Sequence, residues 1–171
     1  MSIKLERSFF NRDVLLVAPD LLGKVLVRKF ENGKTMACTI TETEAYRGEE
    51  DLGCHASRGK TNRTSVMYDQ GGKIYVYLIY GMYWMLNFVT GRKDEPQAVL
   101  IRGIEKYDGP GKLTRALEID KGFNQKDITV SPLLWVEDRG LHLDHEERPR
   151  VGIDYAGAEW AGKPWRFIAK I

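Results

Sequence analysis

The alternation of hydrophobic and polar positions predicts a chain of short strands with a few short helices. Residues 12–23 predict an early helix, which a proline interrupts and a glycine ends. Residues 24–46 predict a β-hairpin, because two strand-like runs flank an Asn-Gly pair at 32–33 that is typical of a two-residue turn. The next stretch, 52–73, is rich in glycine, small polar residues and basic residues, and it predicts a long loop.

The second half of the chain repeats this mixture. It predicts a helix over 109–119 with a proline near its first turn, and short strands over 98–105, 133–138 and 165–171. Helices and strands follow one another without regular alternation, and the clearest pairing is antiparallel. We therefore predict an α+β fold, a single domain with a mixed, mostly antiparallel β-sheet, flanking helices and a protruding β-hairpin.

That protruding hairpin is predicted from residues 74–91, which carry no charge and lie between Lys73 and Arg92. Eighteen residues reach the lower limit for a membrane-spanning helix. However, four tyrosines would place hydroxyl groups through the apolar layer, and Gly81 interrupts the segment. Aromatic and β-branched residues dominate, as strands prefer. We expect two strands that turn near 80–82 and no association with a membrane.

Strand parity separates the aromatic residues of this hairpin. Tyr75 and Tyr77 point to one face of the first strand. Core packing is the expected role of Tyr75, Tyr83 and Trp84. Tyr80 falls at the turn, where burial is hardest, and an exposed aromatic residue there often marks a contact surface.

The predicted strand that ends at Tyr46 carries the candidate chemistry. Its apolar face leads directly into Glu42, Glu44 and Tyr46, with the two carboxylates about 7 Å apart in a regular strand. A carboxylate on the core side of a strand is costly unless it is paired, hydrogen-bonded or functional. We expect Glu42 to pair with an arginine. With Tyr46 and His55 nearby, a functional role is favoured for Glu44.

Composition narrows the class of protein. Residues 1–171, with 43% hydrophobic and 29% charged residues, are typical of one globular domain. The two cysteines, Cys38 and Cys54, are too few for a disulfide scaffold, and the first ten residues do not resemble a signal peptide. We expect a cytoplasmic protein, associated with the nucleoid if the source is bacterial. Two separated cysteines and one nearby histidine do not form a metal site, so no metal and no cofactor are expected.

The formal net charge is +2, but the charges are unevenly distributed. Residues 42–51 hold five acidic residues and one arginine, a net of −4, whereas 56–73 hold four basic residues and one aspartate, a net of +3. Charge alone favours a solvated, salt-bridged loop. The same order also suits a carboxylate site beside a phosphate-contacting surface.

Taken together, a carboxylate, several aromatic residues, a histidine and a basic loop suggest one type of reaction. A carboxylate can activate water for attack on an anomeric carbon. Aromatic faces suit a flat, cationic leaving group. The residues therefore favour cleavage of a base from a sugar over ordinary glycoside hydrolysis.

At these positions the sequence resembles the alkyladenine (3-methyladenine) DNA glycosylase family. The matching segments keep the family's order and cover most of the chain from residue 40 onward: ETEAYRGEEDLGCH (42–55), KIYVYLIYGMYWMLN (73–87), AVLIRG (98–103), GPGKLTRAL (109–117) and RVGIDYAGAEWAGKPWRF (150–167). The resemblance implies a monofunctional DNA glycosylase of base excision repair. Such an enzyme flips damaged purines, among them 3-methyladenine, 7-methylguanine, hypoxanthine and ethenoadenine, out of duplex DNA.

The resemblance also implies roles for individual residues. Glu44 matches the glutamate that deprotonates the attacking water, and Arg102 matches a basic residue near that water. Tyr46 and His55 match residues that line the base pocket. Tyr77 matches the aromatic residue that stacks on the opposite face of the base.

Three further positions concern the DNA and the fit of the base. Tyr80 matches a wedge that enters the minor groove and fills the gap left by the extruded nucleotide. Asn87 matches a residue that discriminates against the exocyclic amine of guanine. Cys54 stands where many relatives carry a smaller residue, and we expect it to narrow the pocket floor.

The expected partner is double-stranded DNA with a damaged purine, bound by a monomer. Two other functions fit the same residues. One is a catalytically silent nucleic-acid-binding module that uses the aromatic residues as a stacking platform. The other is a nucleosidase that acts on small molecules.

Overall fold

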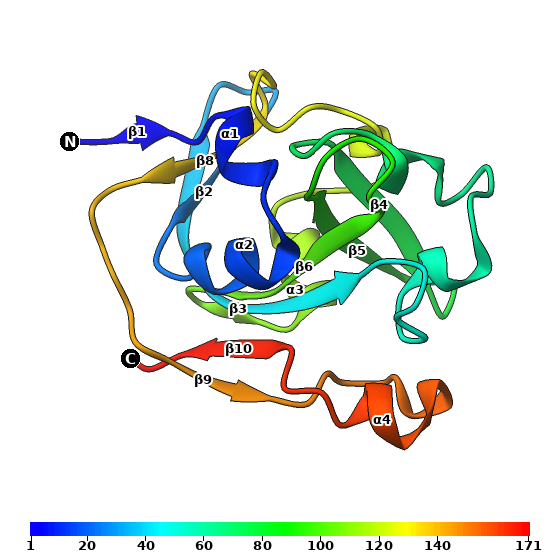
Figure 1. Ribbon diagram of the computed structural model, residues 1–171. Coiled ribbons are helices and arrows are strands. Elements are labelled where there is room, and N and C mark those ends of the chain that lie inside the picture. Colours follow the sequence, from blue (N-terminus) through cyan, green and yellow to red (C-terminus); the bar gives the residue numbers. More distant parts are fainter.

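Strand β3 (Thr35–Arg47) is the centre of the sheet in the computed structural model, which describes residues 1–171 (Figure 1). Strands β2 (Val25–Lys29) and β10 (Arg166–Ala169) pair with successive parts of β3, and β6 (Gln97–Ile104) pairs along its other edge. The strand order is β1-β8-β2-β3-β6-β5-β4, and all strand pairs are antiparallel. The predicted α+β class with a mostly antiparallel sheet is confirmed.

The remaining elements are short. The other strands are β1 (Ile3–Lys4), β4 (Ile74–Ile79), β5 (Tyr83–Val89), β7 (Tyr107–Asp108), β8 (Leu134–Asp138) and β9 (His145–Arg148). The helices are α1 (Arg7–Phe10), α2 (Val14–Asp20), α3 (Pro110–Ala116) and α4 (Gly157–Ala161), with 3-10 turns η1 (His55–Arg58), η2 (Ser65–Tyr68), η3 (Lys121–Phe123) and η4 (Asp154–Ala156). None of these helices has the length and apolar character needed to cross a membrane.

Helix α2 (Val14–Asp20) starts later than its predicted range because Asp13 caps it. The Asp13 carboxylate accepts a hydrogen bond from the N–H of Leu15, so the helix starts at Val14. Gly23, with a φ of +88°, lets the chain turn into β2 after the helix ends. Helix α3 starts at Pro110, as the sequence predicts.

Two predictions about connecting segments, one turn and one loop, need correction. The β2–β3 hairpin closes through three residues, 31–33, because the N–H of Phe30 donates to the carbonyl of Lys34. Gly33 takes the left-handed conformation that such three-residue turns need at their last position, with a φ of +84°. The predicted loop over 52–73 is not irregular throughout, since it contains η1 and η2.

The buried residues form two clusters. The larger one, of 27 residues, lies between the sheet and the helices. The smaller one, of 8 residues, is Cys54, Ala56, Val66, Met67, Tyr68, Tyr75, Val89 and Ala98. Strand parity on β4 is as predicted, because Ile74 and Val76 enter the larger cluster and Tyr75 enters the smaller one. The prediction that Tyr83 is a core residue is wrong: it is 36% exposed, at the start of β5.

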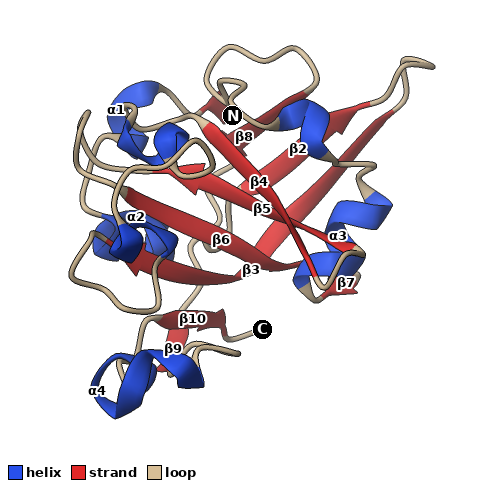
Figure 2. Ribbon diagram, turned by 90° about the vertical axis from the view of Figure 1, so that its right-hand side faces the viewer, coloured by secondary structure: helices blue, strands red, loops and turns tan.

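The C-terminal part forms a small layer beside the main body. Figure 2 shows β9, β10 and α4 together at one side of the molecule, with β10 next to β3, with which it pairs. Within this contact, Arg166 of β10 is opposite Glu44 of β3. The layer therefore adjoins the part of β3 that carries the candidate chemistry.

Candidate active site

The carboxylate of Glu44 is fully buried and held from three directions. The Tyr46 hydroxyl donates a hydrogen bond of 2.9 Å to Oε1, and the Val151 N–H donates one of 2.7 Å to Oε2. Arg102, on β6, brings its Nη1 to 3.7 Å from Oε1. These contacts fix both oxygens of the carboxylate, which is not exposed to solvent.

Burial dominates the electrostatics of Glu44. It raises the pKa of the carboxyl, although Arg102, the Val151 N–H and the Tyr46 hydroxyl each act to lower that pKa. A carboxylate with a raised pKa is a better proton acceptor near neutral pH. Burial and the neighbouring Glu44 also raise the pKa of Tyr46 well above its usual value, so its hydroxyl stays protonated and donates.

Glu42 pairs with arginines, as predicted. Its Oε2 lies 3.2 Å from Nε of Arg102 and 3.3 Å from Nη1 of Arg166. Arg102 thus contacts both glutamates of the strand. The pairing of β3 with β6 is irregular between residues 40 and 43, so the strict alternation assumed from the sequence is locally disturbed at Glu42.

An aromatic pocket adjoins Glu44 through Tyr46, which belongs to both. The cavity is lined by Tyr46, His55, Met67, Tyr75, Tyr77, Asn87 and Ala98. The rings of His55 and Tyr77 are 4.5 Å apart, and those of Tyr75 and Tyr77 are 5.2 Å apart. The cavity measures about 20 Å³, room for little more than one water molecule. A purine can enter only if some of these side chains move.

His55 is neutral at physiological pH. Burial, and then the charges of Arg63 and Arg58, lower its pKa to about 4. Its Nδ1 lies 2.8 Å from the Tyr75 hydroxyl, which orients the ring toward the tyrosines of β4. Arg63 also places its guanidinium 5.2 Å from the ring centre of Tyr77.

Asn87 is buried and lines the pocket. Its side-chain N–H groups donate to the backbone carbonyls of Tyr75, at 3.2 Å, and Met85, at 3.4 Å. These contacts fix the amide plane against the β4–β5 hairpin. Asn87 therefore meets the pocket as a rigid polar group.

Tyr80 lies apart from the pocket, at the tip of the β4–β5 hairpin. It is 81% exposed, and its neighbour Met82 is 61% exposed. Its φ of +54° is in the left-handed region, which a bulky residue adopts at a cost. The fold thus joins Glu44, Tyr46, His55, Tyr77, Asn87 and Arg102 in one region and presents Tyr80 separately. Their individual roles stay predictions.

Sequence reasoning missed an ion pair beside the site. Arg150 and Asp51 are both fully buried, with two hydrogen bonds of 2.7 and 2.9 Å between them. Only long-range folding brings them together, and no local pattern indicates the pair. Cys54 does not itself line the pocket but packs in the smaller cluster with the lining residues Met67 and Tyr75, so its effect on the pocket floor stays a prediction.

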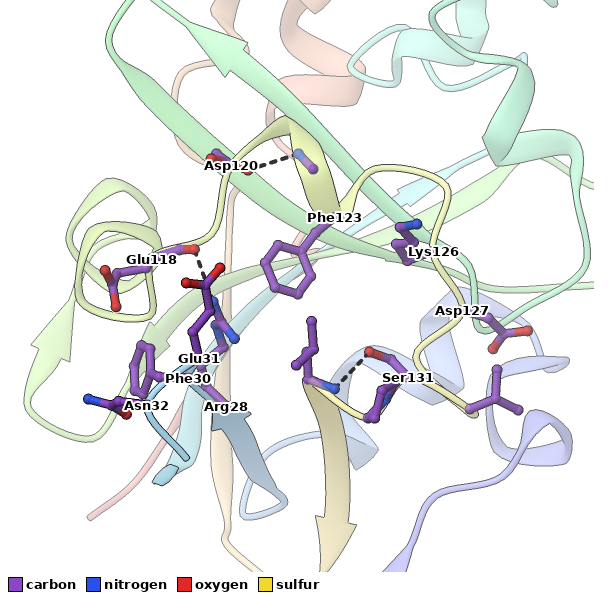
Figure 3. A pocket seen from close by; sticks show the side chains of 14 residues that line it. Arg28, Phe30, Glu31, Asn32, Glu118, Asp120, Phe123, Lys126, Asp127 and Ser131 are labelled. Carbon is purple, nitrogen blue, oxygen red and sulfur yellow. Dashed lines mark hydrogen bonds between the residues drawn. The ribbon is translucent and has the colours of Figure 1, made fainter. Parts of the chain in front are cut away.

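A larger cavity, of about 860 Å³, lies elsewhere, between the β2–β3 turn and the segment that follows α3 (Figure 3). Four of its lining residues are acidic, against Arg28 and Lys126. The Arg28 guanidinium stacks on Phe30 and Phe123 and donates to the carbonyl of Leu117, so it is engaged within the fold. The acidic surplus disfavours DNA phosphates here. No cluster of three potential metal ligands is present in the molecule.

Comparison with known proteins identifies the family. The family described as methylpurine-DNA glycosylase matches residues 8–171. A relative from Natranaerobius thermophilus is 42% identical over 98% of this chain and 96% of its own length. Relatives from Methanocella arvoryzae and Borreliella afzelii are both 45% identical, over 97% and 95% of this chain and 92% and 94% of their own lengths. All three are named, provisionally, 3-methyladenine DNA glycosylase. The chain therefore belongs to the methylpurine-DNA glycosylase family and is a DNA glycosylase, a hydrolase that cleaves N-glycosyl bonds.

Proposed function

We propose that the protein is a monofunctional glycosylase that removes alkylated purines from duplex DNA, with Glu44 as the general base. The observation that carries this proposal is the buried Glu44 carboxylate, held by Tyr46, Val151 and Arg102 directly beside an aromatic pocket. A single carboxylate of raised pKa beside flat rings suits hydrolysis at an anomeric carbon next to a purine.

The proposed reaction needs only water. Glu44 accepts a proton from the water, whose oxygen bonds to C1′ of the deoxyribose. The C1′–N bond breaks, and its electron pair leaves with the purine. Alkylation at N3 or N7 makes the base cationic and thus a good leaving group, so 3-methyladenine and 7-methylguanine are the substrates that this site favours most. Hypoxanthine and ethenoadenine, which are neutral, need protonation as they leave and are slower candidate substrates.

The pocket walls fit a flipped base. In the proposal, the base enters among the rings of Tyr46, His55 and Tyr77, which line the pocket. A neutral His55 avoids repulsion of a cationic base, and the tyrosine faces attract one. The closed cavity of about 20 Å³ then opens only when a base displaces these side chains. Asn87 contributes a fixed polar edge against which the base is read.

The hairpin tip supplies the proposed wedge. Tyr80 is exposed and isolated, as a residue that inserts between bases must be. Flipping costs a few kcal/mol of stacking and pairing, which is less for a damaged base. An inserted aromatic ring offsets part of that cost. We further propose that a monomer in the cytoplasm, at the nucleoid in a bacterial cell, acts on one face of the duplex.

The decisive assay incubates the protein with methylated duplex DNA and measures alkali-labile abasic sites, with unmethylated duplex as control. Abasic sites only in the methylated duplex support the proposal. Tight binding without abasic sites would instead indicate a silent binding module. Release of base from free methylated nucleosides as fast as from duplex would indicate a nucleosidase.

A further inference from the structure

The buried ion pair of Arg150 and Asp51 has further contacts with several elements of the fold. Besides its two hydrogen bonds to Asp51, the Arg150 guanidinium donates to the carbonyl of Ala45, at 3.0 Å, and to that of Trp160, at 3.3 Å. These partners belong to β3, to the turn that follows it and to α4. The pair therefore ties the C-terminal layer of Figure 2 to the strand that carries Glu44.

Stability alone is a weak reason for such a pair. Removing two charges from water is costly, and well-packed apolar residues often replace a buried ion pair without loss of stability. In addition, Nε of Arg150 is buried without a hydrogen-bond partner, a further cost. These costs favour a role for the ion pair beyond stability.

The neighbours of Arg150 indicate a role in placing the groups that bind Glu44. The next residue, Val151, donates its N–H to Oε2 of Glu44. The Arg150 guanidinium also lies 4.9 Å from the ring centre of Tyr46, the residue that donates to Oε1 and lines the base pocket. Its bond to the carbonyl of Ala45 holds the backbone between Glu44 and Tyr46.

We propose that Arg150, fixed by Asp51, is a positioning residue that holds the Val151 N–H and the Tyr46 ring against Glu44 for catalysis. This inference rests on the proposed function. Arg150 does not contact the substrate in this proposal, and it acts through Val151 and Tyr46. Without it, both hydrogen bonds that hold the Glu44 carboxylate lose their alignment.

Four ionisable groups face Glu44. They are Tyr46 on the same strand, Tyr77 on β4, Arg102 on β6 and Arg150 itself. Arg150 and Arg102 favour the ionised carboxylate, whereas burial opposes it. Loss of the Arg150 contacts weakens the two hydrogen bonds, from Val151 and Tyr46, that favour the ionised carboxylate, so Glu44 takes up a proton at higher pH. The acid limb of the plot of release rate against pH should then move to higher pH.

The test uses Arg150→Lys, which keeps the charge but loses the planar fork and the stacking on Tyr46. The matched control is Arg148→Lys, an exposed arginine on β9 that pairs with Glu146. Each variant is compared with the wild-type protein for base release from methylated duplex at excess enzyme and across pH, for binding to lesion duplex, and for thermal unfolding. Asp51→Asn, which weakens the same ion pair, is measured in parallel.

We expect Arg150→Lys to lower the release rate about 10- to 100-fold, because misplaced catalytic groups have effects of that size. The acid limb of its release rate should move to higher pH, while its binding to lesion duplex stays unchanged. The control Arg148→Lys should match the wild-type protein in all of these measurements. Asp51→Asn should show the same changes, smaller in size, and it decides the matter if Arg150→Lys does not fold. A lower unfolding temperature with an unchanged rate and acid limb would overturn the positioning role. Absence of release by the wild-type protein would instead overturn the proposed function on which the role depends.

Discussion

Replacing Tyr46 by phenylalanine isolates one hydrogen bond of the candidate active site. The substitution removes the hydroxyl that donates to Oε1 of Glu44 at 2.9 Å. It keeps the aromatic ring that lines the pocket and stacks on Arg150. Any effect on base release should therefore come from Glu44 and not from a lost pocket wall.

The size of the effect follows from the type of bond. A hydrogen bond to a charged group contributes about 1.5–3 kcal/mol, and one pKa unit corresponds to about 1.4 kcal/mol. The hydroxyl favours the ionised carboxylate, so its loss raises the pKa of Glu44 further. If Glu44 must be ionised to accept a proton, the acid limb of the release rate moves to higher pH by about one to two pH units.

Stability gives a second readout with a defined sign. The pKa of Glu44 in the folded protein is raised above its usual value, so Glu44 favours folding most at low pH, and this contribution is lost as pH rises through the folded pKa. Tyr46→Phe raises that pKa further. The difference in unfolding free energy between variant and wild type at low pH reports the loss of the hydroxyl itself. As pH rises, this difference should grow, because the variant loses more stability than the wild type.

The assay is single-turnover release of methylated purine from duplex DNA between acidic and mildly alkaline pH, with urea unfolding at matched pH values. Tyr83→Phe is the control, because Tyr83 lies at the start of β5, does not line the pocket and has no hydrogen bond from its hydroxyl within the protein. An acid limb that stays in place in Tyr46→Phe would refute the assignment of Glu44 as the titrating base.

Three other predictions follow from exposure, charge and pKa. Tyr80→Asn should weaken binding to lesion duplex without lowering the unfolding temperature, since Asn tolerates the left-handed φ of +54° better than Tyr; unchanged affinity would exclude a wedge. For His55, a pKa lowered to about 4 means that its contribution to stability is present above its usual pKa and is lost as pH falls toward 4. His55→Gln should therefore show a smaller loss of unfolding free energy between pH 7 and 4, by about 3 kcal/mol, in urea titrations. Binding to duplex DNA should weaken linearly, on logarithmic scales, as salt rises from 50 to 200 mM, and a salt-independent constant would contradict phosphate contacts.

The sequence was most informative about features that depend on a single strand or turn. The alternating pattern that ends in Glu44 and Tyr46 correctly placed a carboxylate on the buried side of β3. The aromatic and β-branched residues of 74–91, together with Gly81, correctly indicated a hairpin with Tyr80 at the tip. Both follow from the two-residue period of a strand and from turn chemistry, which are local properties.

Contacts between distant segments were beyond local patterns. Asp51 and Arg150 are 99 residues apart, and nothing near either residue indicates that both are buried. The Val151 N–H that binds Glu44 is a backbone group, which no residue type marks. Tyr83 was misplaced because alternation predicts the direction of a side chain but not where the covering layer ends.

The most direct test of the central claim is base release by Glu44→Gln. The control is Glu49→Gln, which changes an exposed glutamate beyond the end of the same strand. Glutamine keeps the shape of the side chain but cannot accept the proton of the attacking water. We predict that Glu44→Gln binds methylated duplex DNA as the wild-type protein does and releases base at least about 100-fold more slowly, with Glu49→Gln unaffected. Release by Glu44→Gln at the wild-type rate would contradict the account.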